Sequence, residues 1–359
     1  MHCEGCLVDV TIAIDAMGGD HGTSVTVPAA LEYLRKYPND TIVLVGLADE
    51  IETVLRAFKV STGANLRVQA ASEVVGMDES PQAAMRNKKD SSMRVAINLV
   101  KDGTAHACIS AGNTGALMAM ALFCLRGENN IDRPAIAGVW PTLKGDAVVL
   151  DIGATIGADA EQLFEYAVMG AAMARALFDK ERPTVGLLNI GVEEVKGLEE
   201  IRLAGQMLKE ADLPYLDYAG FVEGDDIGKG TTDVVVTEGF TGNIALKSAE
   251  GTATQFAAYL REAMKATFLS RVGYFLARNA FKRLRAKIDP RQKNGGAFLG
   301  LGGLVIKSHG GTDAEGFASA IEIGYSMAKS GIVEKINHDL SAHRQAVAAS
   351  DKVANTGAM

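Results

Sequence analysis

Apolar runs of four residues recur along the chain, and each is followed by a glycine-rich turn and then by a helical pattern. The run at 107–110 leads into Ala111-Gly112-Asn113-Thr114-Gly115, and the runs at 11–14, 234–237 and 304–307 lead into comparable turns. Short buried strands that alternate with helices are typical of a parallel sheet, whose strand ends meet at one edge. The pattern therefore predicts an α/β fold in which four loops share one crevice.

The remaining elements predict a doubly wound, three-layer α/β/α sandwich. Further strands are expected at 41–45, 66–70, 147–150 and 185–190, and helices at 25–37, 49–58, 161–178 and from Gly115 onward. Asn113 or Thr114 can cap the last of these helices, and Ser91 can cap another. Residues 74–90 are expected to be irregular.

A single α/β domain is expected over residues 10–337, because no Pro-rich or Gly/Ser-rich linker interrupts that stretch. Residues 1–9 are expected to form a disordered extension. Residues 338–359 are expected to form a C-terminal tail.

Composition narrows the class of protein. The 359 residues carry a net charge of −8 and 48% of them are hydrophobic, yet no apolar run reaches the roughly 18 residues that span a bilayer. The N-terminus lacks the basic and then apolar order of a signal peptide, so we expect a cytosolic protein. We expect no nucleic-acid partner.

Cysteine usage agrees with a reducing compartment. Cys3 and Cys6 form one C-x-x-C motif beside His2, whereas a closed zinc site needs about four ligands. Cys108 and Cys124 lie in apolar sequence and are expected to be core residues rather than nucleophiles. No ligand spacing elsewhere requires a metal, and no cofactor is expected.

Residues 265–293 are strongly basic, with nine Lys and Arg and one acid, Asp289. The apolar residues around Phe275 and those around Leu284 fall on opposite faces of a straight helix. A break near Arg278 would bring both sets to one side and give a bent, basic projection at about 252–292. An ordinary amphipathic helix with a solvated basic face is the alternative to a surface for a membrane or a partner.

Two of the glycine-rich loops have residues suited to phosphate binding. Main-chain N–H groups of Gly18-Gly19 and of 112–115 can hold an anion at a helix N-terminus, with Asn113 and Thr114 as side-chain donors. Asp15 and Asp20 cannot bind phosphate while they are ionised. Either they orient a cation, or one of them acts as a base.

The loop after 304–307 adds groups for charge and proton transfer. Lys307 and His309 flank Ser308 at the end of the expected strand. An ammonium there can neutralise a phosphate or an oxyanion, and an imidazole can move a proton near neutral pH. Lys196 and Lys247 are further candidate cations, although surface ion pairs are the commoner role for a lysine.

Six motifs in this chain resemble, in the same order, those of the phosphate acyltransferase (PlsX) family of bacterial phospholipid synthesis. They are Asp15-Ala16-Met17-Gly18-Gly19-Asp20, Ser91-Ser92-Met93-Arg94, Ser110-Ala111-Gly112-Asn113-Thr114-Gly115-Ala116, Leu187-Leu188-Asn189-Ile190-Gly191, Gly239-Phe240-Thr241-Gly242-Asn243 and Lys307-Ser308-His309-Gly310. The resemblance covers about residues 10–332.

The resemblance implies a fold similar to isocitrate and isopropylmalate dehydrogenases and to phosphotransacetylases. It implies conversion of acyl–acyl carrier protein and inorganic phosphate to acyl phosphate for phosphatidic acid and phospholipid synthesis. It also implies a homodimer bound peripherally to anionic lipids at the inner face of the cell membrane, near the acyltransferase that consumes acyl phosphate. Because phosphate is itself a nucleophile, we expect direct attack on the thioester without an acyl-enzyme.

The chain departs from the family pattern in one loop. Where the family usually has Asp-x-Gly-Ala-Asn and, two residues later, Asp, this chain has Asp151-Ile152-Gly153-Ala154-Thr155 and then Gly157. Of this motif, only Asp151 is kept as a candidate site residue.

The candidate site residues fall into three groups. Those expected to act in catalysis are Lys307, His309, Asn243 and Lys196. Those expected to bind substrate or phosphate are Asp15, Gly18, Gly19, Asp20, Ser110, Gly112, Asn113, Thr114, Gly115, Gly242, Lys247 and Ser308. Those expected to face a membrane or the carrier protein are Arg271, Phe275, Leu276, Arg278, Lys282, Arg283 and Arg285.

Two other functions remain open from the sequence. One is a coenzyme-A-dependent phosphotransacylase of the same fold, and the other is a non-catalytic membrane-associated scaffold whose loops bind a phosphate head group. A decarboxylating dehydrogenase is disfavoured, because the four loops lack the Arg cluster and the acids that a dicarboxylate and Mg²⁺ would need.

Overall fold

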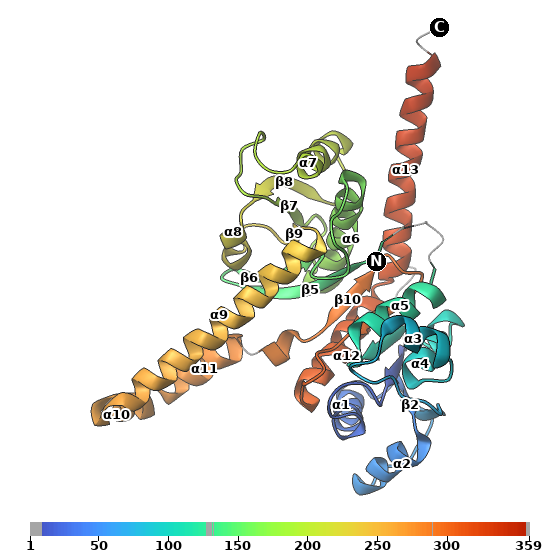
Figure 1. Cartoon of the computed structure of the whole chain (residues 1–359), viewed down its shortest axis with the longest axis vertical. Coiled ribbons are helices and arrows are strands. Elements are labelled where there is room, and N and C mark those ends of the chain that lie inside the picture. Colours follow the sequence, from blue (N-terminus) through green and yellow to red (C-terminus); the bar gives the residue numbers. More distant parts are fainter. Residues whose placement is uncertain (1–8, 127–130, 132, 289, 357–359) are drawn as a thin grey trace.

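The computed structural model describes residues 9–126, 131, 133–288 and 290–356, and its framework is one sheet of 11 strands (Figure 1). The strands are β1 (Thr11–Asp15), β2 (Thr41–Gly46), β3 (Leu66–Ala70), β4 (Ala107–Ser110), β5 (Ala135–Thr142), β6 (Gly145–Leu150), β7 (Thr184–Leu188), β8 (Asp217–Val222), β9 (Val234–Val236), β10 (Gly296–Leu299) and β11 (Leu304–Lys307). Their order in the sheet is β3-β2-β1-β4-β11-β10-β5-β6-β9-β7-β8.

The sheet consists of two parallel halves that run in opposite directions. Strands β3, β2, β1, β4 and β11 are parallel neighbours, and so are β6, β9, β7 and β8. Between the halves, β11 pairs with β10, β10 with β5 and β5 with β6, each time antiparallel. Three successive reversals invert the strand direction. The register nevertheless brings the carboxyl ends of β11 and β6 to the same level, because Lys307 pairs with Gly296, Gly296 with Gly138 and Gly138 with Val149.

The four loops of the predicted crevice therefore come from two halves of opposite strand direction, and the single crevice stays a prediction. The loops after β1, β4 and β11 are neighbours, but the loop after β9 belongs to the other half. The prediction lacked β5 and β10, whose antiparallel pairings reverse the sheet. Only Leu143 and Lys144 join β5 to β6, and so short a connection allows a hairpin but not the crossover that parallel pairing requires.

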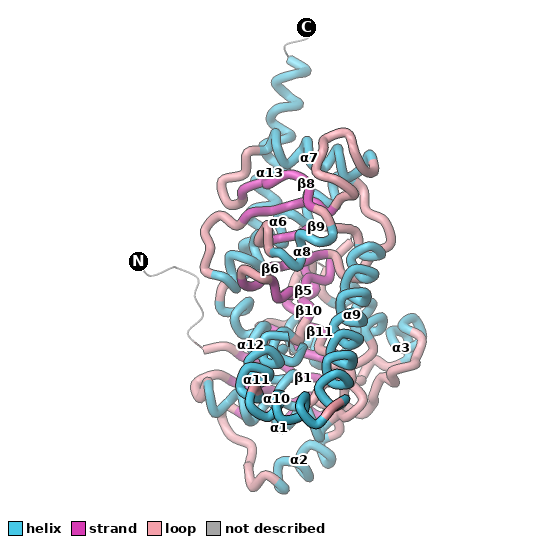
Figure 2. Tube along the Cα trace, turned by 90° about the vertical axis from the view of Figure 1, so that its left-hand side faces the viewer, coloured by secondary structure: helices cyan, strands magenta, loops and turns pink. Residues whose placement is uncertain are grey.

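Helices cover both faces of the sheet, which confirms the three-layer α/β/α architecture (Figure 2). They are α1 (Thr23–Lys36), α2 (Ala48–Ala57), α3 (Pro81–Asn87), α4 (Ser92–Lys101), α5 (Thr114–Cys124), α6 (Ala160–Phe178), α7 (Glu199–Ala211), α8 (Gly224–Lys229), α9 (Gly239–Ala266), α10 (Phe268–Leu276), α11 (Arg278–Ile288), α12 (Ala314–Lys329) and α13 (Ile332–Thr356), with a short 3-10 helix at Pro290–Lys293. The predicted cap at Ser91 is present, because its hydroxyl accepts from the Arg94 N–H at 3.3 Å.

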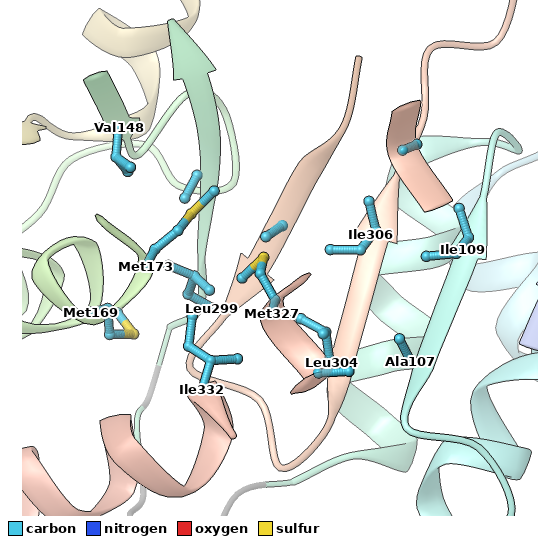
Figure 3. Close-up of a cluster of buried hydrophobic side chains, with 14 of the residues drawn as sticks. Ala107, Ile109, Val148, Met169, Met173, Leu299, Leu304, Ile306, Met327 and Ile332 are labelled. Carbon is cyan, nitrogen blue, oxygen red and sulfur yellow. The ribbon is translucent and has the colours of Figure 1, made fainter. Parts of the chain in front are cut away.

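Two large buried clusters hold the layers together, and a smaller third one lies around Val149, Val222 and Val235. Side chains of α1, α6, α12 and α13 form the larger cluster, and side chains of α4 and α5 form the cluster on the other face. Figure 3 shows part of the larger cluster, where Met173 of α6 and Met327 of α12 gather with Ile306 of β11. The strands contribute to both clusters because alternate side chains point to opposite faces.

The two central cysteines are core residues, as predicted. Cys108 and Cys124 are free and buried in the α4–α5 cluster. Burial raises the pKa of the Cys108 thiol well above its ordinary value. A thiol of this kind is a poor nucleophile.

Helices α9, α10 and α11 form a projection that leaves the body of the protein, with α10 at its far end and α11 returning toward the body (Figure 1). The predicted break near Arg278 is present. The chain also breaks at Thr267, which caps α10 by accepting from the Ser270 N–H at 3.1 Å, and the sequence did not indicate this second break. Among the helices of the described residues, none combines the length and the apolarity needed to cross a membrane.

The boundary expected at residue 337 falls inside α13. Beyond it, Asp339 pairs with Arg175 of α6, and Arg344 pairs with Glu165 of the same helix. The beginning of α13 therefore belongs to the body. Residues 1–8, which hold most of the predicted extension with Cys3 and Cys6, lie outside the described residues.

We predict that Gly242→Ala, at the start of α9, destabilises the protein by about 1–3 kcal/mol, the usual cost of overpacking. Gly242, a candidate phosphate contact, is instead buried: a β-carbon there would lie 1.9 Å from the main-chain oxygen of Asp151. Gly251→Ala in the same helix is the matched control, because its β-carbon would meet no atom within 4 Å and should stabilise the helix by about 0.5–1 kcal/mol. Urea unfolding measures both variants, and equal stabilities would contradict the packing described.

Candidate active site

Hydrogen bonds tie together the loops after β1, β4 and β11. The Ser110 hydroxyl donates to Asp15 Oδ2 at 2.7 Å and accepts from the Gly112 N–H at 3.0 Å. The Asp20 N–H donates to the Gly310 carbonyl at 3.0 Å. The structure thus brings the candidate residues of three loops to one place, and we refer to residues 15–20, 110–115 and 307–311 as the cradle.

Glycine is needed where the backbones of the cradle touch. A β-carbon on Gly18 would lie 2.8 Å from both the Gly112 nitrogen and Asp15 Oδ2. Gly19 has a φ of 86°, and its β-carbon would lie 2.8 Å from the Gly310 oxygen. Such close approach lets main-chain N–H groups, rather than bulky side chains, meet a ligand.

Helix α5 begins at the cradle with a neutral cap. Asn113 accepts from the Ala116 N–H at 3.0 Å through Oδ1, and its Nδ2 donates to the carbonyls of Met77 (2.7 Å) and Glu79 (2.9 Å). Both amide hydrogens are engaged, so the prediction that Asn113 offers a side-chain donor to phosphate is wrong. The first turn, which begins at the exposed Thr114, contains no acidic residue, so the positive end of the helix dipole keeps its field.

Lys307 is the cation of the cradle. Its Nζ donates to the Ala111 carbonyl at 3.2 Å and to the Ser308 carbonyl. Burial lowers the pKa of Lys307 to about 8, against the attraction of Asp15 and Asp20. Asp15 is 1% exposed, and burial raises its pKa despite its hydrogen bonds and the nearby ammonium. Lys307 is therefore still mostly charged at pH 7 but releases its proton more readily than an ordinary lysine.

Ser308 and His309 follow Lys307 in the cradle and differ in the exposure of their side chains. His309 is exposed, and its Nδ1 accepts from the Gly311 N–H at 3.2 Å, which leaves the proton of a neutral ring on Nε2. Ser308 is fully buried, and its hydroxyl accepts from Asn294 Nδ2 at 2.8 Å. The Ser308 hydroxyl therefore serves the interior rather than an anion at the surface. Asn294 lies in none of the motifs, and the sequence analysis missed it.

In the other half of the sheet, the loop after β6 is built around Asp151. Its carboxylate accepts from the N–H groups of Ile136 (2.9 Å), Gly153 (3.0 Å), Ala154 (2.9 Å) and Thr155 (2.8 Å). The Thr155 hydroxyl, at the first departure from the family pattern, donates to the same carboxylate at 2.9 Å. Asp151 thus occupies the row of N–H groups that could otherwise bind an anion.

A second carboxylate occupies the N-terminus of α9. Glu238 accepts from the N–H groups of Phe240 (2.9 Å), Thr241 (2.7 Å) and Gly157 (3.1 Å). Burial alone would raise the pKa of Glu238, but these hydrogen bonds outweigh it and lower the pKa. Gly157, at the second departure, has a φ of 72°, which favours glycine over aspartate. The main-chain N–H groups of the turn at 239–243 are therefore already bonded to the Glu238 carboxylate.

Two further candidate catalytic residues, Asn243 and Lys196, and the candidate phosphate contact Lys247 also lie in this half. Asn243 is exposed above the loop after β6. Lys196 pairs with Glu193 at 2.8 Å, which raises the pKa of Lys196, and Lys247 pairs with Glu250 at 2.7 Å. Strands β10, β5 and β6 separate all three from Lys307 in the sheet.

A packing contact also relates the loops of the two halves. Ile152 and Ala154, in the loop after β6, pack against the buried cluster formed by α4 and α5. The loop that carries Asp151 therefore lies over the same face of the sheet as the helix that begins at the cradle.

The candidate membrane or carrier surface lies on α10 and α11. Phe275 and Leu276 are 63% and 77% exposed, and the Arg278 guanidinium lies 5.1 Å from the centroid of the Phe275 ring. The other described cations of this group, all exposed, are Arg271, Lys282 and Arg283. The side chain of Arg285 lies outside the described residues.

Solved structures with a similar arrangement define the class of fold. The chain is similar to a phosphotransacetylase from Streptococcus pyogenes, with a TM-score of 0.62 and 18% identity over 90% of this chain and 96% of that chain. It is also similar to EutD phosphotransacetylase from Staphylococcus aureus, with a TM-score of 0.58 and 15% identity over 89% of this chain and 94% of that chain. These likenesses show an α/β fold of the phosphotransacetylase kind.

Sequence relatives are more specific. The family model described as "Fatty acid synthesis protein" matches residues 10–335. The chain is 58% identical over 335 residues to the phosphate acyltransferases of Brucella canis and Brucella abortus (strain S19), which covers 92% of this chain and 96% of each relative. The chain therefore belongs to the phosphate acyltransferase (PlsX) family, as its six motifs indicated. It is an acyltransferase of lipid synthesis.

We predict that kcat/KM for acyl transfer falls as the pH rises through about 8. Lys307 loses its proton there, and the neutral amine no longer attracts a phosphate or an oxyanion. Lys307→Arg stays charged and should abolish this fall, whereas Lys196→Arg should keep it, because the pKa of Lys196 is raised rather than lowered. The measurement is the pH dependence of kcat/KM for the wild type and both variants. A fall near pH 8 that persists in Lys307→Arg would assign it to another group.

Proposed function

We propose that the protein transfers the acyl group of acyl–acyl carrier protein to inorganic phosphate, and so makes acyl phosphate for phosphatidic acid synthesis. One observation carries the proposal: of the glycine-rich turns described above, the cradle alone has a neutral cap and a partly buried cation, whereas Asp151 and Glu238 fill the turns after β6 and β9. A phosphate dianion is attracted to the positive end of α5 and to Lys307.

In the proposed reaction, an oxygen atom of the bound phosphate attacks the thioester carbonyl carbon. The new carbon–oxygen bond forms as the carbon–sulfur bond breaks, and the products are acyl phosphate and the carrier thiol. Main-chain N–H groups and the Lys307 ammonium stabilise the charge that develops on the carbonyl oxygen. The leaving thiolate takes a proton, for which Lys307 and His309 are the two candidate donors.

Asn243 and Lys196 are assigned to the acyl donor rather than to phosphate. Both lie near turns that already hold a carboxylate, which disfavours a second anion. The contact of Ile152 and Ala154 with the α4–α5 cluster supports an acyl donor that lies across the face shared by the two halves.

The projection is proposed to meet the acidic carrier protein or anionic lipids. Its exposed apolar residues at Phe275 and Leu276, with the cations around them, suit a membrane interface. In this account, the protein is a cytoplasmic homodimer that binds the inner face of the cell membrane and passes acyl phosphate to the acyltransferase that consumes it.

Palmitoyl–acyl carrier protein, phosphate and hydroxylamine test the reaction. We predict that the wild type yields palmitoyl hydroxamate through trapped acyl phosphate, and that Lys307→Met lowers turnover by about 10² because it removes the charge opposite the oxyanion. Lys209→Met, an exposed lysine on α7, is the control and should behave as the wild type. Faster turnover of palmitoyl–coenzyme A than of the carrier substrate would favour the phosphotransacylase alternative, and no product from either donor would contradict the proposal.

Cosedimentation with phosphatidylglycerol vesicles tests the projection. We predict that a Phe275→Glu, Leu276→Glu variant leaves the vesicle pellet but stays active on soluble substrate, whereas Phe58→Glu on the body still binds. Each cation near an anionic surface contributes about 1 kcal/mol, so wild-type binding should weaken as salt rises. Loss of dimerisation by the double variant, with vesicle binding unchanged, would make this surface a subunit contact instead.

A further inference from the structure

Asn294 joins three parts of the molecule: the base of the projection, the cradle and α12. It directly follows the 3-10 helix Pro290–Lys293, and it is 8% exposed. A buried amide needs hydrogen-bond partners within the protein, since an unpaired one costs stability.

The partners of Asn294 all lie between residues 308 and 316. Its Nδ2 donates to the Ser308 hydroxyl at 2.8 Å, to the Gly316 carbonyl at 2.9 Å and to the Thr312 hydroxyl at 3.3 Å. Its Oδ1 accepts from the His309 N–H at 2.9 Å. One side chain thus fixes the end of the cradle relative to the first turn of α12.

Ion pairs of the residues just before Asn294 hold its segment in place. Arg291 pairs with Asp313 at 2.9 Å and with Glu315 at 2.8 Å, and both acids lie at the start of α12. Lys293 pairs with Asp146 of β6 at 2.6 Å. The segment that carries Asn294 is therefore anchored to both halves of the sheet.

We propose that Asn294 is a positioning residue for acyl transfer, which acts by holding the His309 main chain. The inference rests on the proposed function, in which His309 is a candidate proton donor to the leaving thiolate. Asn294 does not touch the substrate. Its hydrogen bond to the His309 N–H fixes the position of the His309 main chain. A misplacement of about 1 Å at a reacting group lowers the rate by about 10².

A double-mutant cycle tests whether Asn294 acts through His309. We expect Asn294→Ala to lower kcat about 10- to 100-fold with little change in KM for the acyl donor. In a His309→Ala background, Asn294→Ala should cause no further loss, because the group that it positions is gone. Asn294→Asp keeps an oxygen for the His309 N–H and should recover part of kcat. Losses that simply multiply in the double variant would overturn the proposal.

The hydrogen-exchange rate of the His309 main-chain amide tests the same contact independently of enzyme activity. Exchange should be faster in Asn294→Ala and close to wild type in Asn294→Asp, while Asn65→Ala, which removes an exposed asparagine bonded to the Pro38 carbonyl, should leave it unchanged. If Asn294→Ala does not fold, Asn294→Leu has nearly the same size and removes the same bonds. Unchanged exchange would refute the positioning role. A wild type that makes no acyl phosphate would instead refute the proposed function, and the exchange would still decide what Asn294 holds.

Discussion

A glycine-rich turn can hold one negative charge on its main-chain N–H groups, and the site of this protein depends on where that charge comes from. In the half of the sheet that contains β6 and β9, the protein supplies the charge itself, through Asp151 and Glu238. In the other half, α5 is capped by the neutral Asn113, and the Lys307 ammonium lies close to Asp20 and to the buried Asp15, whose pKa is raised. Similar local sequences therefore lead to opposite preferences for an added anion.

Because the sheet reverses direction between its halves, the loops that attract an anion and the loops that already hold a carboxylate belong to different halves. Strands β10 and β5 separate the two halves, and in the proposed reaction phosphate and acyl donor are assigned to different loop groups. The loop after β6 packs against the cluster under α5, and the segment at Asn294 binds the end of the cradle. The base of the projection is linked to the cradle through Asn294 and to β6 through the ion pair of Lys293 with Asp146.

Local features of the fold could be predicted from the sequence, and long-range ones could not. The caps at Ser91 and Asn113 and the buried strand at β4 follow from residue type and spacing alone. The direction of the second half depends on β5 and β10, which the apolar pattern did not reveal. At the site, the motifs led to Lys307 and His309, but not to the use of both Asn113 hydrogens by Met77 and Glu79 or to Asn294, because those partners are distant in sequence.

A crystal structure with bound inorganic phosphate tests the central claim most directly. The account predicts phosphate at the N-terminus of α5, within hydrogen-bonding distance of Lys307, and none at the turns after β6 and β9, where Asp151 and Glu238 keep their hydrogen bonds. Phosphate bound to the N–H groups of Phe240 and Thr241, with Glu238 displaced, would contradict it.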